Sequence, residues 1–273
     1  MTTPTHRIAV LLPAYNAGPD LAVTLDSLRQ QTHPNTLFLV DDGSSRKPDY
    51  ATLIKGMDCR LIELPRNLGI TGAMNAGLAE ILKDKSFDLI ARIDAGDMAQ
   101  PERFTRQVLF LDANSAIDIV GSAIDFRQHD AAGKLLASRI VHFPLTPEAC
   151  RARLPGNSPV SHPAILVRRN VFEKLRGYSE DYPAAEDYDL MWRAARAGFA
   201  IANLPDVLLV KEENPGSISQ RRRRRQIHSR MRIQWANLDM QSVAAWRGLA
   251  RSLLTLALPG QAVSLLKGIV SGK

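Results

Sequence analysis

Asp88-Leu89-Ile90-Ala91-Arg92-Ile93-Asp94-Ala95-Gly96-Asp97 is the stretch that decides the fold of this 273-residue chain. Its first half is a short, largely apolar run of the kind that forms a buried strand. It ends on two aspartates separated by a turn, and Pro101 then favours a helix start. Carboxylates at the carboxyl edge of an open α/β sheet lie where such sheets bind ligands, and their oxygens suit a hard divalent cation. Asp94 and Asp97 are equally suited to capping the next helix, so the rest of the chain must decide.

Three earlier segments repeat the order of strand, polar loop and helix. Largely apolar runs at 8–12, 37–40 and 60–64 predict buried strands, and a polar loop follows each of them. The segment 21–28 carries leucines on one helical face, as a helix packed on a sheet requires. This alternation predicts an α/β fold with a mostly parallel central sheet flanked by helices.

The polar residues that follow these strands should meet at one edge of the sheet. They are Tyr15, Asn16, Asp41, Asp42, Arg66, Asn67, Asp94 and Asp97. An aromatic ring, amides, carboxylates and a guanidinium together suit a nucleotide diphosphate with a metal, because arginine pairs well with phosphate. The dinucleotide-binding G-x-G-x-x-G and the P-loop motif are both missing from the sequence, which disfavours dehydrogenases and P-loop NTPases.

The composition favours a folded protein that works in the cytoplasm. Hydrophobic residues make up 45% of the chain, enough for a sizeable core. Cys59 and Cys150 form no metal-ligand pattern, which favours a reducing compartment. The first seven residues are polar or charged rather than a secretory signal, and the apolar stretch at 252–266 is broken by Pro259 and too short to span a bilayer.

The positive charge is concentrated at one end of the chain. Residues 221–273 contain 11 basic residues and one acid, a net charge of +10, whereas residues 1–220 contain 24 basic and 27 acidic residues. We therefore expect a main domain at 1–220 and a basic, amphipathic helical tail at 221–273. Two apolar helical faces are predicted in the tail, one at Trp246, Leu249, Ala250 and Leu253, the other at Ala262, Leu265, Leu266 and Ile269.

Three partners for the tail are open at this point. Basic amphipathic helices suit an anionic membrane surface, which is the interpretation we favour. The alternative is a helix packed on the main domain with a solvated basic face. Nucleic acid is the weakest interpretation, since no base-stacking or groove-reading motif accompanies the arginines, and we expect no nucleic-acid partner.

The order of several motifs resembles a known enzyme family. They are Ala14-Tyr15-Asn16, Val40-Asp41-Asp42-Gly43-Ser44, Arg66-Asn67-x-Gly69, the stretch 91–97, Ser161-His162-Pro163-Ala164, Gly177-Tyr178, Glu186-Asp187-Tyr188-Asp189-Leu190 and Asn214-Pro215-Gly216-Ser217-Ile218-Ser219. Together they resemble the inverting family 2 glycosyltransferases, over about residues 6–220. The resemblance implies the nucleotide-sugar-binding GT-A fold.

The resemblance also implies roles for individual residues. Positions matching Tyr15 and Asp42 contact the base and ribose in the family, Asp94 and the loop after it hold a metal on the diphosphate, and Asp187 is the catalytic base. We expect the full nucleotide-sugar site to comprise Pro13, Ala14, Tyr15, Asn16, Asp42, Arg66, Asn67 and Asp94. His162 and Glu186 are candidates for the acceptor side, although a lone histidine in a loop is more often structural, and acids opening a helix often serve as caps.

Gly96 departs from the family pattern, which more often has a carboxylate at this position. We expect Asp94 and Asp97 to bind Mn²⁺ or Mg²⁺ all the same. Either Asp97 replaces the missing ligand after a small loop shift, or Asp94 acts with diphosphate and water alone.

The function expected from the resemblance is transfer of a single sugar from a nucleotide-sugar donor to an acceptor hydroxyl, with inversion. The absence of the Gln-x-x-Arg-Trp pattern of processive synthases favours single transfer. The basic tail suggests a lipid-linked or cell-surface glycan acceptor, such as a lipopolysaccharide, and a peripheral position on the inner face of the cell membrane. A nucleotidyltransferase and a non-catalytic nucleotide-sugar binder are the alternatives. The residues do not identify the nucleotide, the sugar or the acceptor.

Overall fold

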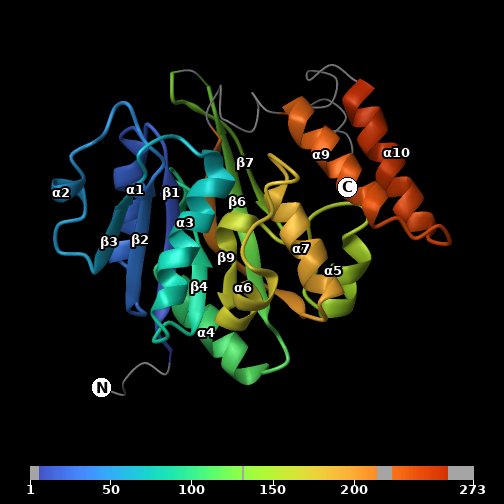
Figure 1. Cartoon of the computed structure of the whole chain (residues 1–273), viewed down its shortest axis with the longest axis horizontal. Helices are drawn as coiled ribbons and strands as arrows, with labels where there is room; N and C mark the ends of the chain where they lie inside the picture. Colours follow the sequence, from blue (N-terminus) through green and yellow to red (C-terminus); the bar gives the residue numbers. More distant parts are fainter. Residues whose placement is uncertain (1–5, 131, 214–222, 258–273) are drawn as a thin grey trace.

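A twisted nine-stranded sheet carries the fold in the computed structural model, which describes residues 6–130, 132–213 and 223–257 (Figure 1). The strands are β1 Ile8–Ala14, β2 Asn35–Asp41, β3 Cys59–Glu63, β4 Leu89–Arg92, β5 Met98–Ala99, β6 Ile119–His129, β7 Leu135–Val141, β8 Leu166–Arg168 and β9 Ile201–Glu213. The helices are α1 Asp20–Arg29, α2 Tyr50–Leu53, α3 Gly69–Lys83, α4 Arg103–Ala113, α5 Pro147–Arg153, the 3-10 turn η1 His162–Ala164, α6 Arg169–Leu175, α7 Glu186–Arg196, α9 Arg223–Ala236 and α10 Val243–Ala257.

The first four long strands form the predicted parallel arrangement. They lie in the order β3-β2-β1-β4, and every pair among them is parallel. β1 runs on through Pro13 to Ala14, past the end expected from the sequence. Proline is tolerated there because the pairing of β1 with β4 stops at Leu11, so the missing N–H of Pro13 costs no bond on that side. The carboxyl ends of these strands therefore meet at one edge, as predicted.

The second half of the sheet mixes strand directions. β8 is antiparallel to both β4 and β6, and β5 is antiparallel to β9, whereas β6 and β9 are parallel. β6 and β7 are antiparallel neighbours and form a hairpin. The mostly parallel sheet expected from the sequence thus describes the first half of a mixed α/β sheet.

Helices cover both faces of this sheet. Alternate residues of β1 point to opposite faces, so Val10 packs with Leu25 of α1, while Leu11 packs with Met74 of α3. Helix α3 approaches the sheet closely at Gly77, where a Cβ would collide with Leu11. The helical faces predicted from apolar spacing are therefore the buried faces of α1 and α3.

The two C-terminal helices lie side by side next to α5 and α7 (Figure 1). α9 buries Ile227 and Ile233 against the rest of the chain, and its Gln234 donates to the carbonyl of Pro155 at 2.8 Å. α10 approaches through Gly248, where a Cβ would collide with the same carbonyl oxygen. This part of the tail is packed on the main domain.

The predicted apolar face of α10 is mostly exposed. Leu249 is buried, but Trp246, Ala250 and Leu253 face solvent. The predicted second face at 262–269, the motif 214–219 and the first two arginines of the basic run lie outside the described residues. Within the described ranges, no helix has the length and apolar character needed to cross a bilayer.

Candidate active site

The loops after β1 and β2 are tied together where the sequence predicts the nucleotide. The backbone N–H of Asn16 donates to Ser44 Oγ at 2.7 Å, and Asn16 Oδ1 accepts from the N–H of Arg46 at 3.0 Å. Asn16 has a φ of 47°, a left-handed conformation that asparagine tolerates better than most residues. Pro13 and Ala14 close β1 directly before it, and Tyr15 is 46% exposed, which leaves its ring free to meet a base.

Asp42 connects this pair of loops to the loop after β3. Its Oδ1 accepts from the N–H of Leu68 at 2.6 Å, and burial raises the pKa of its carboxyl group. Gly43 has a φ of 64°, and a Cβ there would collide with the backbone of Arg66. Arg66 and Asn67 are exposed at the same place. The structure therefore brings together the predicted base, ribose and phosphate residues, from three separate strand ends.

Hydrogen bonds to Thr24 of α1 stabilise the Asp94–Asp97 turn. The N–H of Gly96 donates to Thr24 Oγ1 at 2.8 Å, and this hydroxyl donates to the carbonyl of Asp97 at 2.8 Å. Gly96 has a φ of 101°, a conformation that residues with a side chain rarely adopt. A glycine at this position is therefore required by the turn that α1 fixes.

Two cations contact the aspartates of this turn. Arg92, which is buried, pairs with Asp94, and Lys211 Nζ lies 3.5 Å from Asp94 Oδ2 and 3.6 Å from Asp97 Oδ2. Burial opposes ionisation of Asp94, but the charges of Arg92 and Lys211 outweigh it and hold the pKa of Asp94 below its usual range. Burial dominates at Asp97 and raises its pKa to about 7.

The donor atoms of the Asp94–Asp97 turn decide whether a metal ion fits there. Among the described residues, no group of three or more His, Cys, Asp and Glu side chains is arranged to hold a metal ion. The two available carboxylates already share the ammonium of Lys211, and Asp94 is also paired with Arg92. A divalent cation needs oxygen ligands with surplus negative charge, so this arrangement does not fit the Mn²⁺ or Mg²⁺ expected from the sequence.

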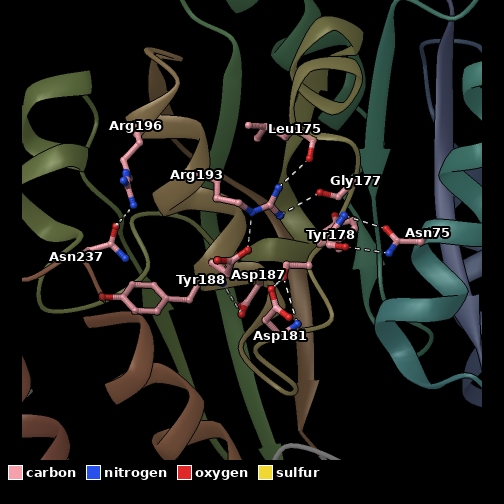
Figure 2. Close-up of polar contacts among 12 residues, drawn as sticks. Asn75, Leu175, Gly177, Tyr178, Asp181, Asp187, Tyr188, Arg193, Arg196 and Asn237 are labelled. Carbon is pink, nitrogen blue, oxygen red and sulfur yellow. Dashed lines mark hydrogen bonds and ion pairs between the residues drawn. The ribbon is translucent and has the colours of Figure 1, made fainter. Parts of the chain in front are cut away.

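The predicted catalytic base Asp187 and the acceptor-side candidate Glu186 open helix α7. Asp187 Oδ1 accepts from the N–H of Tyr188 at 2.7 Å (Figure 2). Burial raises the pKa of Asp187, and burial together with the charge of Asp187 raises the pKa of Glu186 to about 7. Glu186 Oε2 is buried and has no hydrogen-bond partner within the described part of the chain. Both carboxyl groups are thus more basic than free carboxylates.

Asp189 has a different position. It accepts from Arg193 Nε at 2.6 Å. The same guanidinium donates to the carbonyls of Leu175 and Gly177, each at 3.0 Å (Figure 2). The pair Asp189–Arg193 therefore fastens α7 to the segment that follows α6. A supporting role for Asp189 agrees with this geometry.

Tyr178 is influenced by charges from both the Asp94–Asp97 turn and the start of α7. Its backbone is clamped by Asn75 of α3 through hydrogen bonds of 2.8 and 2.9 Å (Figure 2). Burial raises the pKa of its phenol, and the charges of Arg92, Asp94, Glu186 and Asp187 also act on it. The carboxylates of α7 and the Asp94 turn therefore lie in one electrostatic cluster.

His162 lies buried in the same cluster. Its Nε2 is 2.8 Å from the Tyr178 hydroxyl, and burial and Arg92 lower the pKa of its imidazole well below 6.5. The histidine predicted for the acceptor side is thus neutral and already hydrogen-bonded.

Three residues of this cluster had no role in the sequence prediction. Arg92 belongs to the motif at 91–97 and carries no prediction of its own. A charged residue inside an apolar strand nevertheless indicates a buried partner of opposite charge. Tyr178 likewise stood only in a motif. Lys211 gave no signal, because only the pairing of β9 with β5 brings it to the Asp94 turn.

The chain was compared with known proteins by family model and by sequence. Residues 9–176 match the model described as Glycosyl transferase family 2. The chain is 28% identical over 247 residues to the amylovoran biosynthesis glycosyltransferase AmsE of Erwinia amylovora, covering 88% of this chain and 89% of that protein. It is 23% identical over 215 residues to the UDP-Gal:alpha-D-GlcNAc-diphosphoundecaprenol beta-1,3-galactosyltransferase of Escherichia coli, covering 77% and 75%.

Solved structures share the fold. TarS of S. aureus in complex with UDP-GlcNAc superposes with a TM-score of 0.68 at 17% identity, over 90% of this chain and 71% of that one. Against a longer TarS structure, this chain covers 42% of that protein. The mannosyltransferase PcManGT of Pyrobaculum calidifontis, in complex with GDP-Man and Mn²⁺, gives 0.62 at 19% identity, over 99% and 77%. With the family model matching more than half of its residues, the chain belongs to glycosyltransferase family 2, and it is an enzyme of the GT-A fold.

Proposed function

We propose that this glycosyltransferase transfers one sugar per event from a nucleotide-sugar donor to an acceptor hydroxyl, with inversion at the anomeric carbon. The observation that carries the proposal is the contact between the loops after β1, β2 and β3, where Asn16 bonds Ser44 and Leu68 bonds Asp42 at one edge of the sheet. The charge of Asp94 also acts on Asp187 at the start of α7. The donor class is supported by the UDP-GlcNAc and GDP-Man bound to the structural neighbours. Membership of the family disfavours the alternatives of a nucleotidyltransferase and a non-catalytic binder.

In the proposed reaction, Asp187 accepts the proton of the acceptor hydroxyl. The acceptor oxygen forms its bond to the anomeric carbon while the bond from that carbon to the diphosphate breaks, so the diphosphate leaves with the bonding electron pair. Tyr15 and Asp42 would hold the base and ribose, and Arg66 would contact the diphosphate. Positive charge near the leaving group stabilises the transition state more than the ground state, since negative charge develops there.

No step of this proposal uses a metal ion. The Mn²⁺ or Mg²⁺ expected from the resemblance stays a prediction, supported by the Mn²⁺ in one structural neighbour and opposed by the ion pairs at Asp94 and Asp97.

We further propose a lipid-linked or cell-surface glycan as the acceptor, made on the cytoplasmic face of the membrane. The named relatives act in amylovoran biosynthesis and on a diphosphoundecaprenol-linked sugar, which supports this class. Exposed apolar side chains on the C-terminal helices support contact with a membrane. A groove of about 550 Å³ between these helices is lined by Tyr182, His228, Met231, Arg232, Trp235, Ala236, Leu249 and Leu253.

The test is a donor panel of UDP-, GDP- and dTDP-sugars, incubated with polyprenyl-diphosphate-linked sugar acceptors. We expect release of nucleoside diphosphate with one donor class, and NMR of the product should show an anomeric configuration opposite to that of the donor. Asp187→Asn serves as the inactive control. Retained configuration, or turnover of no donor, would contradict the proposal.

A further inference from the structure

The ammonium group of Lys211 lies close to both aspartates of the Asp94–Asp97 turn. Its Nζ is 3.5 Å from Asp94 Oδ2 and 3.6 Å from Asp97 Oδ2. β9 places it there, because Val210 pairs with Met98 of β5, the residue directly after Asp97. Since β5 and β9 are hydrogen-bonded at this point, the approach of Lys211 to the turn is fixed by the sheet.

The two cations of this turn differ in access to solvent. The Arg92 side chain is 6% exposed and pairs with Asp94 from the protein interior. The side chains of Lys211 and Asp94 are 29% and 32% exposed. An incoming diphosphate therefore meets Lys211, whereas Arg92 acts on it only through Asp94.

The same geometry competes with a divalent cation. A metal held by Asp94 and Asp97 would lie within a few ångströms of the Lys211 ammonium, and like charges at that distance repel strongly in a partly buried site. Gly96 offers no third carboxylate, and its φ of 101° disfavours any replacement that would supply one.

We propose that Lys211 binds the diphosphate of the donor in the position of the divalent cation, so that donor binding is independent of metal. The inference rests on the proposed function, since it requires a nucleoside-diphosphate sugar as donor. Lysine is well suited to this role because its ammonium is a compact point charge on a flexible stem, which can turn from carboxylate to phosphate.

The test is isothermal titration with UDP, GDP and dTDP, each in EDTA and in Mn²⁺. We expect the wild-type protein to bind one of these nucleotides with the same affinity in both buffers. Lys211→Met should lower that affinity at least tenfold in EDTA, and Lys211→Arg should keep most of it. Lys83→Met is the matched control, since Lys83 is an exposed lysine of α3 whose ion pair in the described part of the chain is with its helix neighbour Glu80.

Mn²⁺ binding gives a second readout that needs no catalysis. The EPR signal of free Mn²⁺ in nucleotide without protein is the reference. The signal should match this reference with wild-type protein and fall below it with Lys211→Met, because the variant removes the ammonium that Asp94 and Asp97 share. Loss of wild-type nucleotide binding in EDTA overturns the inference even where Lys211→Met fails to fold. Unchanged affinity in a folded Lys211→Met also overturns it while leaving the proposed function intact. A wild-type protein that binds none of the three nucleotides in either buffer contradicts the proposed function itself.

Discussion

The Nε2 of His162 lies 2.8 Å from the hydroxyl of Tyr178, and both side chains are buried behind the active site. The two rings also meet edge to face, with centroids 5.4 Å apart. This pair joins η1 to the segment between α6 and α7. A structural role for His162 agrees with this contact.

The first prediction concerns this pair. Tyr178→Phe keeps the ring but leaves a buried imidazole nitrogen without a partner, which costs about 1–3 kcal/mol. We expect the free energy of unfolding in urea to fall by that amount. Tyr182→Phe is the control, because the Tyr182 ring packs under Arg232 and its substitution preserves the ring. Equal stability of the two variants would show that the His162–Tyr178 bond contributes little.

The second prediction concerns the buried carboxyl group of Glu186. Burial raises its pKa in the folded state to about 7, whereas an unfolded glutamate titrates near 4.3. A raised pKa means that its contribution to stability is fully present below the unfolded pKa and is lost as the pH rises through 7. Glu186→Gln should therefore gain stability relative to wild type by about 1–3 kcal/mol between pH 5 and pH 8.5.

Urea unfolding of both proteins at several pH values measures this difference. Glu80→Gln, which makes the same substitution at a half-exposed acid of α3, is the control. Parallel curves for wild type and Glu186→Gln would mean that Glu186 titrates as an ordinary glutamate, and its environment would need another explanation.

The third prediction concerns the membrane. Deleting residues 221–273 is a poor test, since it would expose the sites where Ile227 and Ile233 pack. Trp235 and Leu253 are 65% and 50% exposed, so replacing both with serine should disturb only the surface. We expect wild-type protein to sediment with phosphatidylglycerol vesicles less strongly as salt rises, because exposed charges are screened.

The double variant should lose most of that binding at every salt concentration. A matched variant with serine at Leu109 and Leu136, which are also exposed but lie on α4 and β7, should bind like wild type. Equal binding of the two double variants would place the membrane contact elsewhere on the chain.

The parallel half of the sheet and its edge were predictable because they depend on local patterns. Short apolar runs form buried strands, and the polar loops after parallel strands necessarily converge. The resulting proximity of Asn16, Asp42 and Arg66 follows from the fold alone, and the hydrogen bond from Leu68 to Asp42 agrees with it.

The ion pairs at the Asp94 turn were not predictable in the same way. Lys211 is separated from Asp94 by more than a hundred residues, and only the antiparallel pairing of β9 with β5 brings them together.

The buried face of α10 also differs from the apolar face that the sequence predicts. Gly248 lets α10 approach Pro155 closely, and Ser252 donates to Gln234 of α9. The face with small residues is therefore buried, and the face with Trp246 and Leu253 is exposed.

The fourth prediction concerns Asp187. A sugar hydroxyl is a poor nucleophile at neutral pH, so transfer needs a base placed at its proton. The burial that raises the pKa of Asp187 makes it a stronger base, and the N–H of Tyr188 holds one of its oxygens in place at 2.7 Å. Asp187→Asn keeps the shape and removes the basicity, and loss of one general base lowers kcat by about 10²–10⁴.

Variants of Glu186 and Asp189 show whether Asp187 is the base. Nucleotide affinity of Asp187→Asn, measured by titration, should stay close to wild type, because the proposed function places this side chain at the acceptor and not at the donor. Glu186→Gln and Asp189→Asn should each lower kcat less, and Asp189→Asn should act mainly through the anchoring bond to Arg193. If Glu186→Gln is inactive while Asp187→Asn keeps more than about a tenth of the turnover, which is less than the loss of a base would cost, the base is Glu186. If donor affinity falls as far as kcat in Asp187→Asn, the residue binds the donor and the base lies elsewhere.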